Sequence, residues 1–165
     1  MYKLSESEPI QTEYRRSLKM FDDQFVCFSN SPGGINLVGA IIVVAQTDFA
    51  GVHIAARNLA EDFARVTSQS PSPVEILTPE QDGPADVAGT AIIVGSIETS
   101  SILQRLEQDG KLDFGQIRGK WESYTTSVVD SPFDGCRSAL VIAGSDKRGA
   151  IFGVYSLSEQ LGVSP

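Results

Sequence analysis

The residues with the clearest chemical potential form a short polar segment, residues 145–148 (Ser-Asp-Lys-Arg), near the end of the chain. An apolar run, residues 139–143, precedes the segment, and apolar residues at helical spacing follow it over residues 149–161. This order predicts a strand, a tight turn and a helix, the unit from which parallel sheets are built. Two cations then stand where a helix begins, although the partial positive charge of a helix N-terminus disfavours cations there. We expect a neighbouring carboxylate, an anionic ligand or another domain to compensate for them.

Asp146, Lys147 and Arg148 are therefore the candidate residues for contact with a substrate or with another domain. Lys147 and Arg148 are suited to the carboxylate of a uronic acid, because charge-assisted hydrogen bonds to carboxylates are strong. Asp48 and Ser96 follow two other apolar runs, so the carboxyl ends of parallel strands would bring them to the same crevice. Alternatively, Arg148 pairs with a carboxylate inside the domain and tethers the last helix.

A phosphate-binding loop is only weakly indicated. Gly144 to Gly149 fit the spacing G-x-x-x-x-G, but Ala150 and Ile151 stand where such a loop has Lys and Ser or Thr. No G-x-G-x-x-G follows a predicted strand, so a dinucleotide site has little support. We expect no cofactor.

The histidine and the two cysteines do not suggest a reactive centre. His53 lies off the apolar stripe of its predicted helix, so we expect it to be solvated or at a sheet edge rather than a catalytic base. Cys27 and Cys136 are expected to be buried or half-buried thiols, and a disulfide depends on a proximity that the sequence leaves open. One histidine and two distant cysteines predict no metal site.

Paired carboxylates are sufficient for glycoside hydrolysis, so they were considered as catalytic groups. Six of them lie near predicted turns: Asp48, Glu98, Glu122, Asp130, Asp134 and Asp146. Each has a structural role available. We expect Asp48, Glu98 and Asp146 to cap helices, Asp130 and Asp134 to form turns and Glu122 to face solvent from a strand. The spacing selects no pair, and no catalytic residue is predicted.

The apolar pattern predicts an α/β fold. Strands at residues 39–45, 91–94 and 139–143 each precede a helix, and these helices end near residues 66, 108 and 161. Further strands are predicted at residues 24–28, 74–77 and 121–129. Val- and Ile-rich strands that precede helices are typical of sheets covered by helices. We expect a mixed, largely parallel-cored sheet of about six strands with about three helices.

Length and charge narrow the classes of function. The 165 residues fit a single α/β domain at residues 21–165, preceded by a flexible arm at residues 1–20. A net charge of −8 argues against a nucleic-acid partner, because phosphate binding needs a basic face. The longest apolar stretch, Leu37 to Ala45, is far shorter than the roughly 20 residues that span a bilayer. No signal peptide is visible in the polar N-terminal segment.

The C-terminal part closely resembles glycoside hydrolase family 115, whose members are xylan α-1,2-glucuronidases. The resemblance is carried by residues 144–149, 151–155 and 157–165, which read GSDKRG, IFGVY and LSEQLGVSP. Gly119-Lys120-Trp121-Glu122 and the strand end at residues 92–95 support it, and it extends over roughly residues 20–165.

In that family the corresponding region is a non-catalytic α/β domain, similar to the small domain that precedes the barrel in β-hexosaminidases. It packs on a TIM-like barrel, which needs about 250 residues of its own and which this chain has no length to supply. The resemblance thus implies an accessory domain or a truncated form, inactive alone, of a hydrolase that degrades hemicellulose. Family members are usually extracellular, whereas this chain shows no signal peptide, so its localisation stays open.

Two kinds of partner follow from the resemblance: the catalytic barrel of a parent hydrolase, or a sugar derived from glucuronoxylan. If a barrel covers part of the domain, we expect an exposed apolar patch of several hundred Å² on the isolated chain. The alternative is a free-standing α/β module that binds a uronic acid or a protein partner.

Overall fold

The computed structural model describes residues 26, 28, 34–85, 87 and 89–163. This part of the chain forms five strands and three helices. In order they are β1 (Ile41–Ala45), α1 (Ala50–Thr67), β2 (Val74–Leu77), β3 (Gly89–Ser96), α2 (Ser101–Gln108), β4 (Tyr124–Asp130), β5 (Cys136–Gly144) and α3 (Lys147–Gln160).

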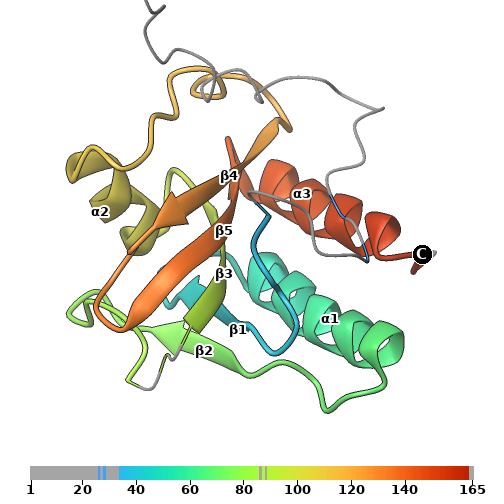
Figure 1. Cartoon of the computed structure of the whole chain (residues 1–165). Coiled ribbons are helices and arrows are strands. Elements are labelled where there is room, and N and C mark those ends of the chain that lie inside the picture. The colour runs from blue at the N-terminus through green and yellow to red at the C-terminus, as the bar shows by residue number, and fades with distance from the viewer. Residues whose placement is uncertain (1–25, 27, 29–33, 86, 88, 164–165) are drawn as a thin grey trace, which may run out of the picture.

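The five strands form one sheet in the order β2-β1-β3-β5-β4 (Figure 1). The first four are mutually parallel, and β4 pairs antiparallel with β5 at one edge. The predicted α/β class with a mixed, largely parallel sheet is therefore confirmed. The sixth predicted strand, residues 24–28, lies outside the described residues except for Val26 and Phe28, and the predicted arm at residues 1–20 lies wholly outside them.

Both faces of the sheet are covered, which explains why its central strands β1, β3 and β5 carry continuous apolar runs. In β1, Ile42 and Val44 pack toward α1 and α3, whereas Val43 and Ala45 pack toward α2 on the opposite face. Figure 1 shows α1 and α3 side by side on one face, with α2 on the other. A shift of the register by one residue would turn these side chains to the opposite face of the sheet, so the register of the strand pairs is well specified.

Helix α3 lies unusually close to the sheet at Gly153. A Cβ atom at this position would lie 2.6 Å from Ile142 Cγ2 and 3.0 Å from Tyr124 Cδ2. Glycine permits this approach because it has no side chain. The close contact holds α3 against β4 and β5.

The predicted ends of the second and third helices are confirmed. Asp109 is the C-cap of α2, and the following Gly110 has a φ of 69°. Gly162, with a φ of 88°, follows the C-cap Leu161 of α3. Left-handed backbone after a helix favours glycine, so these residues were readable from the sequence. None of the helices in the described part combines the length and apolarity of a membrane span.

Two predicted caps were wrong. Phe49 is the N-cap of α1 and makes no side-chain cap hydrogen bond, while the preceding Asp48 is engaged elsewhere. Ser100 caps α2 in place of Glu98, because its Oγ accepts a hydrogen bond from the Leu103 N–H at 3.4 Å. In both cases the helix begins later in the chain than the apolar pattern indicated.

Candidate contact site at the carboxyl edge of the sheet

The predicted site residues all lie at one edge of the molecule. The carboxyl ends of the parallel strands β1, β3 and β5 meet there, and the antiparallel β4 begins there. Asp48 and Ser96 contact each other where β1 and β3 end, whereas Asp146, Lys147 and Arg148 lie at the start of α3. The structure thus divides them into two groups.

Asp48 fills the position between β1 and β3, where the strand order reverses and α/β proteins commonly bind ligands. Its carboxylate accepts hydrogen bonds from the N–H groups of Ser96 and Phe49, both at 2.8 Å, and from Thr99 Oγ1 at 3.0 Å. Burial raises the pKa of Asp48 above its ordinary value, and these three hydrogen bonds offset that rise only in part. The carboxylate therefore holds the strand ends together.

No free space remains between Asp48 and Gly95, because Asp48 and Ser100 pack directly against this glycine. A Cβ atom on Gly95 would lie 2.7 Å from Ser100 Oγ and 3.0 Å from Asp48 Oδ2. The hydrogen-bond partners of Asp48 include no second carboxylate among the described residues, so the two-acid arrangement of a glycosidase is not formed by them. The predicted crevice is occupied by the protein's own hydrogen bonds.

Asp146 caps α3, as predicted. Oδ1 accepts a hydrogen bond from the Gly149 N–H at 2.8 Å, and Oδ2 accepts one from the Glu122 N–H at 2.9 Å. Burial by itself raises the pKa of Asp146, but these hydrogen bonds and the charge of Arg148 outweigh it, so the pKa lies below its ordinary value. The anion that the start of this helix favours is thus supplied by the chain itself.

The lowered pKa of Asp146 predicts a pH-dependent contribution to stability. A carboxyl whose folded-state pKa lies below its unfolded value of 3.8 stabilises the fold above that pH, and the contribution is lost as the pH falls through the folded-state pKa. We expect the stability advantage of wild type over Asp146→Asn to be constant from pH 7 to pH 5 and to shrink below about pH 4. Urea unfolding across this range measures it.

The control for this experiment is Asp82→Asn, because the Asp82 side chain is 96% exposed. Its difference from wild type should stay small throughout the range. A stability difference between wild type and Asp146→Asn that grows as the pH falls would contradict the lowered pKa of Asp146.

The compensating carboxylate expected for the cations is Glu122. Arg148 Nη1 lies 2.7 Å from Glu122 Oε1, and both side chains are partly exposed, so the pair contributes about 0–1 kcal/mol. Glu122 was predicted to face solvent from a strand, which is wrong: its φ is 51° and β4 starts only at Tyr124. The contact with α3 holds this residue in a turn.

Lys147 and Arg148 also lie over aromatic rings. Lys147 Nζ is 5.9 Å from the centroid of the Phe49 ring, and Arg148 Cζ is 6.0 Å from that of Phe152. These distances are at the outer limit of cation–π interactions. The cations therefore border an apolar surface on the helices.

This helix-pair surface consists of four partly exposed side chains on and next to α1 and α3: Phe49, Ile54, Phe152 and Tyr155. The two helices are bridged across it by Asn58, whose Nδ2 donates a hydrogen bond to the Tyr155 hydroxyl at 3.0 Å. Aromatic residues and arginine are enriched in protein interfaces. The surface has the composition of a contact face.

His53 was predicted to be solvated or at a sheet edge, and it lies near the strand ends as a partly buried residue. Its Nε2 atom is buried without a hydrogen-bond partner among the described residues, so this part of the ring is not solvated. The ring lies near Asp48, where the first turn of α1 packs against the strand ends, and its charge interaction lowers the pKa of Asp48. Local spacing on one helix could not indicate this tertiary contact.

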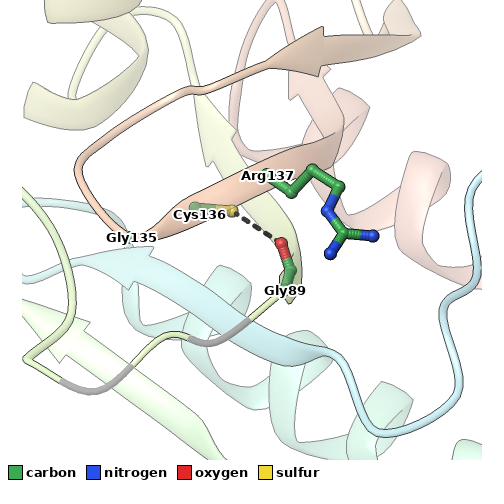
Figure 2. A pocket seen from close by; sticks show the side chains of 4 residues that line it. All are labelled: Gly89, Gly135, Cys136 and Arg137. Atoms are coloured by element: carbon green, nitrogen blue, oxygen red, sulfur yellow. Dashed lines mark hydrogen bonds between the residues drawn. The ribbon is translucent and has the colours of Figure 1, made fainter.

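Cys136 is a free, buried thiol at the opposite edge of the sheet. Figure 2 shows it beside Gly89, whose carbonyl oxygen accepts a hydrogen bond from Sγ at 3.6 Å, while the Arg137 side chain extends away from the thiol. Burial raises the pKa of Cys136 by more than hydrogen bonds from the backbone lower it. Because the thiolate is the reactive form, the thiol is a poor nucleophile at neutral pH. Cys27 lies outside the described residues. No cluster of three or more metal-ligating side chains occurs within the described part of the chain.

Comparison with known proteins relates the fold to a solved structure. No protein-family model matches the chain, and no curated protein matches it. A solved structure of a family 115 4-O-methyl-α-glucuronidase, which has specificity for decorated arabinogalactans, matches 76% of this chain at 26% identity with a TM-score of 0.53. The chain resembles a small domain of a family 115 glucuronidase. The sequence-based resemblance is thereby confirmed.

The match covers most of this chain but only a small share of the glucuronidase chain. The aligned region spans 14% of the glucuronidase chain, so the likeness concerns a minor part of that enzyme. The match describes the fold of this part, and function resides in particular sites.

Proposed function

We propose that residues 21–165 form a non-catalytic accessory domain of a glycoside hydrolase related to family 115, which acts in carbohydrate degradation. The observation that carries the proposal is the unequal match, 76% of this chain against 14% of the glucuronidase. Supporting it, Asp48 and Asp146 are both used in structural hydrogen bonds to backbone N–H groups.

The accessory role requires a face that packs on the catalytic part, and we assign it to the helix-pair surface. Ile54 is 54% exposed on α1, and Phe152 is 43% exposed on α3. Lys147 and Arg148 at its border supply charge for the interdomain contact, together with Asp146 at the start of the helix. Burying exposed aromatic and aliphatic groups there would stabilise a complex by about 25 cal/mol per Å² of apolar area, before the costs of association.

The test measures binding and turnover separately. The chain alone should show no turnover of aldouronic acids, and it should bind a family 115 catalytic part from which the corresponding domain has been removed. We expect the double change Ile54→Asp and Phe152→Asp to weaken this binding by at least about tenfold in calorimetry, because both are exposed apolar side chains of the proposed contact face.

Val128→Asp is the matched control, because Val128 is also 54% exposed but belongs to the edge strand β4. Its affinity should stay within about twofold of wild type. Turnover at a rate comparable to a glucuronidase, or equal weakening by both variants, would refute the proposal.

A further inference from the structure

An open depression of about 460 Å³ lies at the carboxyl edge of the sheet, next to the start of α3 that borders the helix-pair surface. Its lining residues are Glu98, Gly119, Lys120, Trp121, Ser145 and Asp146. Trp121 is 85% exposed, the highest value among the large hydrophobic side chains described. Trp121 was predicted to lie on a strand, which is wrong, because β4 begins three residues later.

The turn that carries Trp121 is held firmly against α3. The Ser123 N–H donates to Ser145 Oγ at 3.0 Å, and the Ser145 N–H donates to the Ser123 carbonyl at 2.7 Å. The neighbouring Glu122 has a left-handed backbone and donates its N–H to Asp146. Exposing an indole forgoes the stabilisation that its burial would provide, and fixing its backbone lowers the entropy lost when a ligand binds.

The lining favours an uncharged, hydroxylated ligand. The carboxylates of Glu98 and Asp146 repel anions, and Asp146 already occupies the start of α3. The carboxylate of Asp146 accepts hydrogen bonds from the backbone of Gly149 and Glu122 and also interacts with the backbone N–H of Arg148. A carboxylate has about four acceptor positions, so one remains for a hydroxyl group of a ligand. Lys120 adds a donor. One indole among polar groups is too small an apolar area for a stable protein interface.

We propose that this depression binds a neutral pyranose unit of an oligosaccharide, with the indole of Trp121 stacked on the apolar C–H face of the ring. Asp146 and Glu98 accept hydrogen bonds from the sugar hydroxyls, and Lys120 donates to a ring or hydroxyl oxygen. This sugar contact goes beyond the accessory role and involves no catalytic step.

The experiment uses the intrinsic fluorescence of the chain, because Trp121 is the single tryptophan in the sequence. Titration of the 165-residue chain with xylohexaose should give a saturable blue shift at millimolar sugar, and glucuronic acid at equal concentration should give none. In calorimetry, Trp121→Ala should weaken xylohexaose binding at least about tenfold and Trp121→Phe less, since phenylalanine retains a smaller stacking face. Tyr155→Ala, on the helix-pair surface, should bind xylohexaose as wild type does.

Three results would overturn the sugar site, provided that circular dichroism shows an intact fold. They are the absence of a saturable shift with xylohexaose, an equal response to glucuronic acid, and a shift that follows protein concentration rather than sugar. The last would indicate that Trp121 contacts another protein surface. None of these results affects the proposed accessory role, because its test measures binding of the catalytic part through Ile54 and Phe152.

Discussion

Gly149→Ala is expected to lower the free energy of unfolding by about 3 kcal/mol or more, because the new methyl group has no space. A Cβ atom on Gly149 would lie 2.9 Å from the carbonyl carbon of Ser123 and closer still to its oxygen. The obstacle is backbone, and the mutual hydrogen bonds of Ser123 and Ser145 hold it in place. Either α3 or the turn before β4 must move, and both are anchored to the sheet.

Urea unfolding measures this loss, with Gly51→Ala as the matched control. A Cβ atom on Gly51 would meet only Ile151 Cδ1, the end of a flexible side chain, at 3.1 Å. Alanine has a higher helix propensity than glycine, so Gly51→Ala should change stability by no more than about 1 kcal/mol, in the stabilising direction. Equal stability of Gly149→Ala and wild type would mean that α3 does not pack on the turn as described.

The same contacts explain the phosphate-loop spacing of Gly144 and Gly149. A Cβ atom on Gly144 would overlap the backbone N of Ala150, and one on Gly149 would overlap the Ser123 carbonyl oxygen. The glycines are therefore required by close packing of the backbone at both ends of the segment. Gly149 also donates its N–H to Asp146, so that donor is already used within the chain.

Asp48→Ala is expected to cost about 2–5 kcal/mol of unfolding free energy, since it removes the acceptor of three hydrogen bonds at once. The Ser96 N–H is the most costly to leave unpaired, because Ser96 is fully buried. The end of β3 and the N-terminus of α1 would lose their common contact. Thermal or urea unfolding at pH 7 checks the size of the effect.

Asp82→Ala provides the control for charge, because it removes the same carboxylate from a side chain that is 96% exposed. Its salt bridge with Arg105 is worth about 0–1 kcal/mol. If the two substitutions destabilise the chain equally, net charge rather than the hydrogen bonds of Asp48 accounts for the loss.

Much of the secondary structure was readable from local patterns. The predicted strand at residues 74–77 coincides with β2, and glycines marked the ends of α2 and α3. The Val- and Ile-rich strands predicted a sheet with helices on its faces, because a strand without a polar side must be covered on both. Asp146 was recognised as a cap because a cap and its helix are neighbours in sequence.

Partners across the fold were decided by the tertiary structure. Asp48 and Ser96 are 48 residues apart and meet only because β1 and β3 are adjacent in the sheet. Glu122 and Trp121 were expected on a strand, yet contact with the start of α3 bends this segment into a turn and exposes the indole. Residue types and spacing encode periodicity along the chain. Strand order and the distance between packed elements determine which side chains meet, and these arise only when the whole core is assembled.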